Sequence, residues 1–327
     1  MRITIAGDIG SGKTTVAGQL AAHARAELFS TGGIQRQLAA ARGITTLELN
    51  RLAETDPSID RQIDGYLQTL PKGNLVVESR MAWRFVPNAR KIFLYVLKQE
   101  AARRILSAKR NDESYQLLDD AVLQITERRK SELKRFQKYY HVNIDDLRNY
   151  DRVIDTTFAT PAAVVDRISS PDSLQYWPAI WLNPKNLLPT RDDCNDSELL
   201  QVASLIGESG FDESQPIEVL YVDHAFFVVG DHRRAGASIR AGLEYVPLKL
   251  IASDDEVYVR GLTARRFVEQ TVTDRLVREW EGAANFRYPY PIWKQEQHSS
   301  AEANLDSGSV VPAALPVGSS GSPSRDP

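Results

Sequence analysis

The chain has 327 residues, 42% of them hydrophobic and 25% charged, a length and composition that suit two globular domains. The net charge of −3 gives no overall basic signature for nucleic acid, and a single cysteine, Cys194, excludes an internal disulfide or a cysteine-based metal cluster. No apolar run approaches the roughly 18 residues of a membrane span, and the first residues predict a strand, not a signal peptide, so we expect a cytoplasmic protein without membrane contact.

A glycine-rich motif lies close to the N-terminus. The pattern G-x-x-x-x-G-K-T runs from Gly7 to Thr14, between a β-branched strand and a helix expected at Val16–Arg25. In such a phosphate loop, backbone N–H groups and the helix N-terminus bind a phosphate chain, and the lysine, here Lys13, reaches the β- and γ-phosphates. The hydroxyl of Thr14 is the expected Mg²⁺ ligand. We therefore predict an ATP site made by Gly7, Asp8, Ile9, Gly10, Ser11, Gly12, Lys13, Thr14 and Thr15.

Strands and helices alternate from residue 27 to residue 168. Strands are expected at 27–33, 74–80, 91–96 and 151–156, and helices at 34–42, 47–54, from 56 onward, and at 118–140. This alternation predicts a parallel α/β sheet that binds its ligand at the carboxyl ends of the strands. Glu78, Arg80 and Asp155 stand at such ends, as the phosphate loop does.

The helix expected at 118–140 combines apolar residues at helical spacing with a group of basic ones. The basic residues are Arg128, Arg129, Lys130, Lys134 and Arg135. Each of them taken singly fits a solvated helix face. As a group beside a triphosphate site, they predict a clamp on the transferring phosphoryl group.

Residues 1–168 resemble the cytidylate kinases, in the short form typical of archaea. Besides the phosphate loop, the resemblance is carried by Ser30–Arg36 with Ala53–Asp60, by Val76–Arg80, and by Glu127–Phe136 with Tyr139–Tyr140 and Tyr150–Thr156. It implies that Arg36 and Arg80 hold the acceptor, and that Arg110, Arg128 and Arg135 of a mobile lid engage the transferring phosphoryl group. Two positions depart from the family, which usually has an acidic residue near Gly33 and a glutamate where Arg129 stands. The acceptor pocket is thus altered, which points away from plain CMP, while the donor motif is intact.

The texture of the chain changes at Ser169. Residues 169–176 are the expected linker, followed by a helix at 197–209, strands at 216–222 and 225–229 around a tight turn, a helix opening at 230, and a strand at 246–251. Residues 257–280 are expected to be one long charged helix. The aromatic and basic residues at 285–294 either stack on single-stranded bases or, as is more usual, pack on their own domain. The tail at 295–327 is expected to be disordered.

Residues 177–252 resemble the ParB/sulfiredoxin-type domain. The resemblance is carried by Asn183-Pro184, by Gln215-Pro216-Ile217 and by the turn from Gly230 to Ala235. It implies an anion site at a helix start, formed by Gly230, His232, Arg233 and Arg234. Because His232 replaces the more usual acidic residue or arginine, the alternative is a degenerate scaffold in which Arg233 pairs structurally.

The predicted fold is an α/β, nucleoside-monophosphate-kinase-like parallel sheet at 1–168, a smaller α+β ParB-like domain with a helical extension at 177–294, and the tail. Three functions fit it. The first is an ATP-dependent kinase of 5-hydroxymethyluracil in DNA, similar to the phage kinases of base hypermodification; if it is phage-encoded, its compartment is the host cytoplasm. The second is a CMP or dCMP kinase with a regulatory ParB-like domain. The third is a non-catalytic, NTP-switched DNA-binding protein, against which the arginine-rich lid argues. We favour the first, because a CMP kinase needs no such appendage, with Glu78 as the expected proton acceptor.

Overall fold

The first half of the chain alternates strands and helices, and its strands coincide with the β-branched runs of the sequence. The computed structural model describes residues 1–107, 117–171, 176–192 and 194–290. The strands of this half are β1 (Arg2–Gly7), β2 (Glu27–Ser30), β3 (Leu75–Glu78), β4 (Arg90–Tyr95) and β5 (Arg152–Asp155). Its helices are α1 (Lys13–Ala24), α2 (Thr31–Ala41), α3 (Thr46–Ala53), α4 (Pro57–Gln68), α5 (Ala82–Phe85), α6 (Lys98–Ser107), α7 (Leu118–Tyr140) and α8 (Pro161–Ser169), with a short 3-10 turn η1 (Leu147–Asn149).

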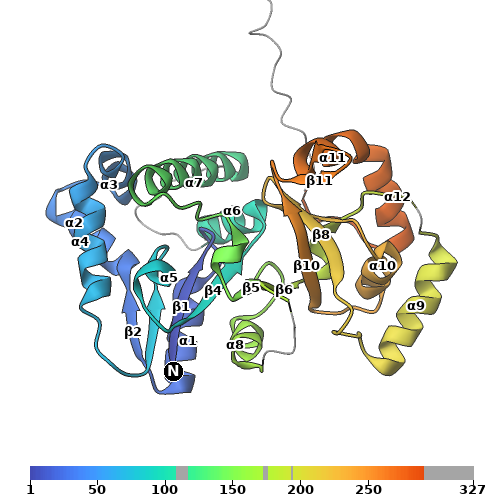
Figure 1. Ribbon diagram of the computed structural model, residues 1–327, viewed down its shortest axis with the longest axis horizontal. Helices are drawn as coiled ribbons and strands as arrows, with labels where there is room; N and C mark the ends of the chain where they lie inside the picture. Colours follow the sequence, from blue (N-terminus) through green and yellow to red (C-terminus); the bar gives the residue numbers. More distant parts are fainter. Residues whose placement is uncertain (108–116, 172–175, 193, 291–327) are drawn as a thin grey trace, which may run out of the picture. The chain divides into compact units, whose positions relative to one another are not determined.

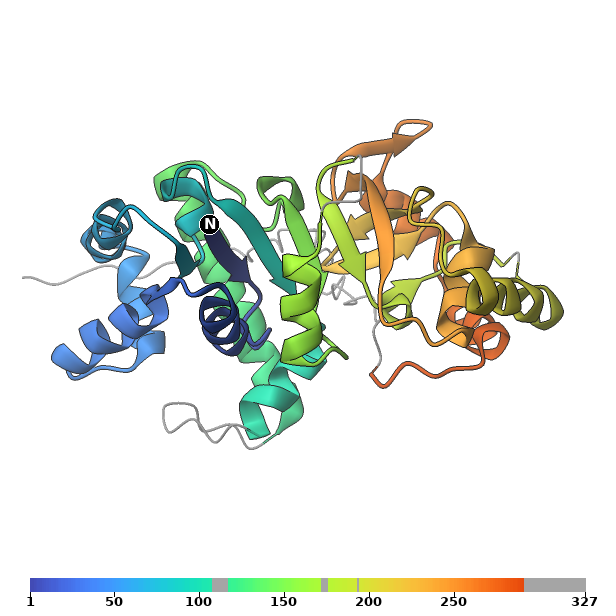
Figure 2. The ribbon, with the colours of Figure 1, turned by 90° about the horizontal axis from the view of Figure 1, so that it is seen from below.

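These strands pair in parallel in the order β2-β3-β1-β4-β5 (Figure 1). Their carboxyl ends therefore meet at one edge of the sheet, and the phosphate loop leaves β1 at that edge. Helices α1 and α8 lie side by side against one face of the strands (Figure 2). The predicted kinase-like parallel sheet is confirmed.

The second half adds parallel and antiparallel strands, a separate β11–β12 hairpin, and helices packed around them. Its strands are β6 (Ala179–Leu182), β7 (Leu187–Leu188), β8 (Ile217–Val222), β9 (Ala225–Val228), β10 (Val246–Ser253), β11 (Val257–Val259) and β12 (Leu262–Thr263). Its helices are η2 (Pro184–Asn186), α9 (Asp196–Ser209), α10 (His232–Arg240), α11 (Ala264–Thr271) and α12 (Asp274–Ala284).

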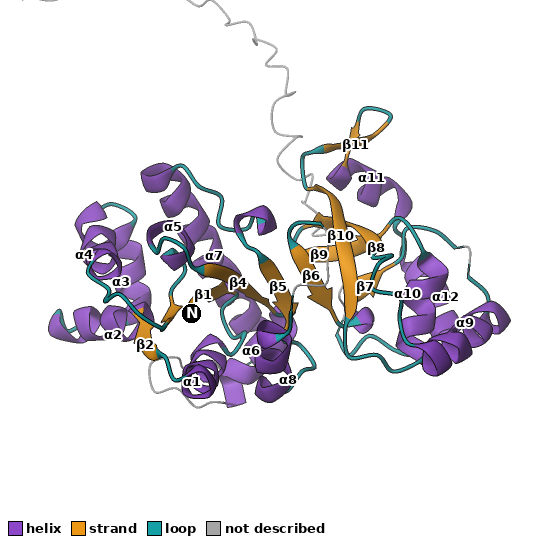
Figure 3. Ribbon diagram, turned by 60° about the horizontal axis from the view of Figure 1, so that its bottom comes forward, coloured by secondary structure: helices purple, strands orange, loops and turns teal. Residues whose placement is uncertain are grey.

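The sheet of the first half continues without a break into the second. Strand β6 pairs in parallel with β5, and the order runs on as β6-β10-β8-β9-β7 (Figure 3). Tyr95 of β4 packs on Phe226 of β9, with ring centroids 5.2 Å apart. Asp155, at the end of β5, accepts from the backbone N–H of Asn183 at 3.1 Å and from the side-chain amide of Asn186 at 2.6 Å. The described residues consequently belong to one compact unit.

The prediction of a long helix at 257–280 is wrong. The structure has the β11–β12 hairpin there, followed by two separate helices, α11 and α12. Arg260 and Gly261 turn the chain with φ of 50° and 77°. Thr263 and Thr273 then accept the N–H groups of Arg266 and Leu276, so each threonine starts a new helix. The two threonine caps and the turn with positive φ therefore divide the segment that the charge pattern predicted as one helix.

The aromatic segment after α12 packs back on the protein. Phe286 and Tyr288 form an edge-to-face pair at 4.6 Å against the main hydrophobic cluster, and the hydroxyl of Tyr290 donates to Glu100 of α6 at 3.0 Å. Residues 291–294 and the predicted disordered tail lie outside the described residues. Within the described ranges, no helix has both the length and the hydropathy that a membrane crossing requires.

Candidate active site

The phosphate loop joins β1 to α1 through three glycines with positive φ. At Gly7, with φ of 141°, a Cβ would lie 2.3 Å from the carbonyl oxygen of Leu94 in β4. At Gly10, with φ of 79°, a Cβ would lie 2.8 Å from that of Ala101 in α6. Gly12 is the N-cap of α1, with φ of 80°. Glycine is therefore needed for the turn and for the close packing of the loop against β4 and α6.

Lys13 lies under the loop and holds it together. Its ammonium donates to the carbonyl oxygen of Gly7 at 3.0 Å and to that of Asp8. Burial, aided by the charge of Arg80, lowers the pKa of Lys13 to about 8. A bound polyphosphate would favour the charged form and raise this pKa again.

The other residues of the phosphate loop differ in their burial and contacts. Ser11 is buried, and its hydroxyl donates to the carbonyl oxygen of Asp8 at 2.9 Å. Ile9 packs against the apolar cluster between α6 and α7, and Thr15 is exposed on the first turn of α1.

A second group of oxygen ligands lies beside Lys13. Thr14 donates to Oε1 of Glu78 at 2.9 Å, and Ser30 donates to Oε2 at 2.7 Å, so the predicted Mg²⁺ ligand and the predicted base share one contact. Hydroxyl and carboxylate oxygens are ligands that Mg²⁺ prefers, usually together with substrate phosphates. No cluster of three or more His, Cys, Asp or Glu that could bind a metal occurs in the described part of the chain.

Arginines surround one buried glutamate of α7. Glu132 has no exposed surface, and the Nε atoms of Arg80 and Arg128 lie 2.7 Å and 3.4 Å from its two carboxylate oxygens. Burial alone would raise the pKa of Glu132, but Arg80, Arg128, Arg129 and Arg135 together hold it below its usual range. Burial lowers the pKa of Arg80 to about 10. The structure thus brings two of the predicted arginines together around a residue that was not predicted.

The other predicted arginines lie apart from that pair or outside the described residues. Arg135 is fully buried, with Nε 3.0 Å from Asp60 of α4 and NH1 donating to the carbonyl oxygen of Asn50 at 3.2 Å. Arg36 is exposed on α2. Arg110 falls outside the described residues.

Arg104 of α6 is a loop contact that the sequence reasoning missed. Its guanidinium donates to the carbonyl oxygens of Thr156, at 2.5 Å, and Thr157, at 3.0 Å, after β5, and reaches that of Gly10 at 3.4 Å. Glu100 holds its Nε at 2.8 Å. The only signal in the sequence was the pair Arg103-Arg104, soon after the strand expected at 91–96.

The four residues of the predicted anion site in the second half make separate contacts. Gly230 precedes α10 and packs against Glu218. His232 is buried, and its Nε2 accepts from the backbone N–H of Thr190 at 3.2 Å. Arg234 donates to the carbonyl oxygens of Gln215, at 2.6 Å, and Asp212, at 3.0 Å. Arg233 is exposed and pairs with Glu198 at 3.0 Å.

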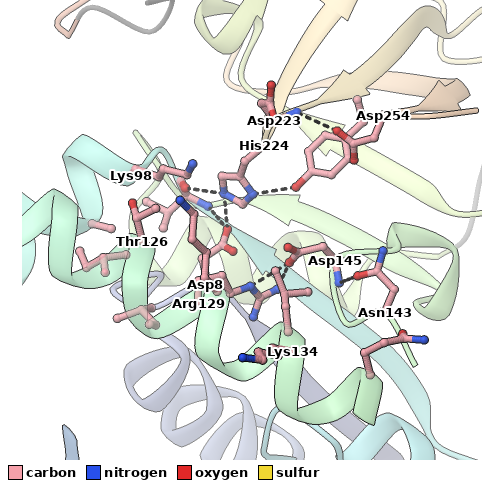
Figure 4. A pocket seen from close by; sticks show the side chains of 18 of the residues that line it. Asp8, Lys98, Thr126, Arg129, Lys134, Asn143, Asp145, Asp223, His224 and Asp254 are labelled. Atoms are coloured by element: carbon pink, nitrogen blue, oxygen red, sulfur yellow. Dashed lines mark hydrogen bonds and ion pairs between the residues drawn. The ribbon is translucent and has the colours of Figure 1, made fainter. Parts of the chain in front are cut away.

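The second half reaches the phosphate loop through the β8–β9 turn. His224 of this turn places Nε2 3.1 Å from Oδ2 of Asp8, which also accepts from the backbone N–H of Val96 at 3.0 Å (Figure 4). Burial alone would raise the pKa of Asp8, but His224 and then Arg129 outweigh it and lower the pKa. Asp8 was predicted only as a loop residue, and His224 was not predicted as a site residue.

A pocket of about 610 Å³ opens beside this contact. Its walls come from the loop, from α7 and from the second half, as Figure 4 shows, and include Asp8, Thr126, Arg129, Tyr221, His224 and Arg265. The volume lies within the usual range for small-molecule sites, about 300–1,000 Å³.

The first half of the chain is similar to proteins of known family. Residues 2–158 match the cytidylate kinase-like family. A cytidylate kinase of Halobacterium salinarum is 40% identical over 170 residues, which cover 51% of this chain and 86% of that protein. A cytidylate kinase of Methanosarcina barkeri is 39% identical over 161 residues, 48% of this chain and 87% of that protein. The solved structure of shikimate kinase from Bacteroides thetaiotaomicron aligns with 51% of this chain and 96% of its own, at 16% identity and a TM-score of 0.36.

Proposed function

This chain belongs to the cytidylate kinase-like family and is a phosphate-loop phosphotransferase of the nucleotide kinase class, and we propose which acceptor it uses. The proposed acceptor is the hydroxyl of 5-hydroxymethyluracil in DNA. ATP is the proposed donor. The product would be a phosphorylated carbinol, activated for further substitution of the base.

The residues around the phosphate loop fit ATP and Mg²⁺. Lys13, whose ammonium donates to the carbonyl oxygen of Gly7, is proposed to reach the β- and γ-phosphates. The Thr14 hydroxyl and the Glu78 carboxylate would offer oxygen ligands for the metal. Bound Mg²⁺ would neutralise charge that develops on the phosphates. Arg128 and Arg135 are proposed to engage the transferring phosphoryl group, and Arg36 and Arg80 to hold the acceptor. The ion pairs of Arg80 and Arg128 with Glu132 support a common site for these two arginines.

The contact between His224 and Asp8 carries the choice of acceptor. A kinase of free nucleotides needs only what corresponds to the first half of this chain. About half of this chain covers 86–87% of the length of the matched cytidylate kinases. Here the second half supplies a wall of the pocket beside the phosphate loop. An acceptor bound by the second half would therefore lie next to the proposed donor site.

We assign a ParB-like character to residues 177–294, with DNA as the ligand that this half delivers to the kinase. A base in a duplex must leave the stack to reach such a pocket, which costs a few kcal/mol, less where the base is mispaired. Gly230, His232, Arg233 and Arg234 remain the proposed anion-binding turn, and Arg233, as the exposed member, is the residue best placed to meet a phosphate.

CMP or dCMP is the second candidate acceptor, because proteins named cytidylate kinase are the matched relatives and the arginine cluster is within the matched region. In that case the second half regulates the kinase. A third possibility is an NTP-switched protein that hydrolyses without a phosphorylated product.

The test is transfer of label from γ-labelled ATP with Mg²⁺. CMP, dCMP, unmodified DNA and hydroxymethyluracil-containing DNA are offered side by side. Label on the modified DNA alone supports the proposal, label on CMP or dCMP replaces it with the nucleotide kinase, and free phosphate alone favours the switch. Lys13→Ala is the matched control, which should abolish transfer and leave DNA binding by the second half intact. Transfer that survives this change would contradict the role of the phosphate loop.

A further inference from the structure

Helix α7 separates two chemically different environments beside the phosphate loop. One side carries Glu132 and Arg135, which pair with Arg80 and with Asp60 of α4. The other side lines the pocket with Thr126 and Lys130, among others. The arginine side suits a charged acceptor phosphate. The pocket side carries both acidic and basic residues, and part of its wall comes from the second half of the chain.

Asp8 presents an uncommitted carboxylate oxygen at this pocket. Its Oδ2 is fixed by the N–H of Val96 and by His224, while Oδ1 has no hydrogen bond within the described part of the chain. The side chain is only 9% exposed. Asp8 directly follows Gly7, so the carboxylate lies in the loop that carries the donor phosphates. A hydroxyl that enters the pocket would find Oδ1 as an acceptor beside the donor.

His224 is held in one orientation by its own half of the chain. Its Nδ1 lies 2.7 Å from the hydroxyl of Tyr221, and Tyr221 is buried. Burial raises the pKa of Tyr221 well above its ordinary value, so this hydroxyl keeps its proton and can donate it to Nδ1. The proton of the imidazole then sits on Nε2, the atom that faces Asp8. The aspartate, the histidine and the tyrosine form a chain that crosses the two halves.

The mouth of the pocket carries groups that suit a nucleotide unit of a polymer. Lys130 and Lys134 are exposed there and make no ion pair with any described residue. Gln137 and Asn143 add side-chain amides, which can donate to and accept from the edge of a pyrimidine. Two lysines at the rim suit the phosphates that flank an extruded base. The acidic lining residues of the second half, Asp223, Asp254 and Asp255, pair with Arg265.

We propose that this pocket, not the arginine side of α7, receives the acceptor hydroxyl, with Asp8 as the catalytic proton acceptor and His224 as its positioning residue. In the step, the acceptor O–H bond breaks and its proton passes to Oδ1 of Asp8. The acceptor oxygen forms a bond to the γ-phosphorus, and the bond from that phosphorus to the β–γ bridging oxygen breaks, releasing ADP. The inference deepens the proposed function and rests on it for the identity of the acceptor.

The first test blocks the pocket. Thr126→Trp places a large side chain in the pocket, and Glu127→Trp puts the same side chain on the neighbouring exposed position of α7, which does not line it. We expect Thr126→Trp to raise the KM for the acceptor at least tenfold with the KM for ATP unchanged, and Glu127→Trp to change neither. Equal behaviour of the two variants would overturn the pocket assignment.

The second test removes the base. Asp8→Asn keeps the size of the side chain and should lower kcat by about 10²–10⁴-fold, the usual contribution of a general base, with binding of an ATP analogue retained. His224→Ala should lower kcat with little change in either KM, and His224→Gln, which restores an N–H donor, should recover part of it. Full kcat in Asp8→Asn would refute the base, and equal loss in both His224 variants would refute the positioning role.

Both tests use the acceptor that the native protein labels. The proposal of a DNA acceptor and the proposal of the pocket can therefore be refuted independently of each other. Label on CMP at pH 8 that is blocked by Thr126→Trp would refute the DNA acceptor and keep the pocket. It would also refute the base, because the accepting phosphate oxygen of CMP carries no proton at that pH. Label on modified DNA that survives both Asp8→Asn and Thr126→Trp would keep the DNA acceptor and refute the pocket. If the native protein labels nothing, anisotropy of a fluorescent hydroxymethyluracil oligonucleotide decides, and equal affinity for the native protein and Thr126→Trp would overturn the pocket.

Discussion

Replacing Glu132 by Gln tests whether this one carboxylate holds the arginine cluster. The side chain is fully buried, lies 2.7 Å from Arg80 and 3.4 Å from Arg128, and is the acidic centre among four arginines. Glutamine has nearly the same shape but no charge, so the arginines are left facing one another in a poorly hydrated site. Removing one partner of a buried ion pair typically costs about 3–5 kcal/mol.

The assay is urea unfolding followed by tryptophan fluorescence, since Trp83 donates to the carbonyl oxygen of Arg80 at 2.9 Å and so reports on the cluster. With a slope of about 3 kcal/mol/M, a loss of about 3 kcal/mol moves the midpoint by roughly 1 M. Glu127→Gln, exposed on the same helix, should change stability by less than about 0.5 kcal/mol. Equal midpoints for the two variants would show that Glu132 does not organise the arginines.

Three further predictions concern the loop and a buried acid. Because burial lowers the pKa of Lys13 to about 8, ATP binding at pH 8–9 should take up protons, seen as a calorimetric enthalpy that varies with the ionisation enthalpy of the buffer; no variation would refute the lowered pKa. Burial raises the pKa of Asp64 to about 6, above the unfolded value of about 3.9, so its contribution to stability falls as the pH rises from about 4 through 6. Asp64→Asn should therefore raise the Tm at pH 8, by the equivalent of about 2 kcal/mol, and hardly at pH 4, and an equal change at both values would contradict this. Gly7→Ala drives a Cβ to 2.3 Å from Leu94 and should abolish ATP binding, whereas Gly12→Ala meets no atom within 4 Å and should cost only about 1 kcal/mol for its positive φ, both checked by calorimetry and thermal melting.

Some features were predictable because their physical causes are local. The phosphate loop is one, since its glycines, its lysine and the flanking strand and helix lie within a short contiguous segment. The turn at Asp223-His224 is another, because two positive φ values, 50° and 69°, close a two-residue hairpin. The helix expected at 257–280 failed for an equally local reason, since two threonine caps and a glycine turn were read only as part of a charged stretch.

Other features depend on residues that are distant in sequence. A glutamate among basic residues is typical of a solvated helix face. Only the packing of α7 against α3 and the ion pair with Arg80 make Glu132 the buried centre of a cluster. Likewise, nothing near Arg152 shows that β5 pairs with β6, because pairing between strands is set by long-range packing. The sequence by itself determined the phosphate-loop pattern between a strand and a helix, and with it the class of nucleotide kinase. Only the tertiary structure decided that His224 meets Asp8, because that contact requires the sheet to run unbroken from one half of the chain into the other.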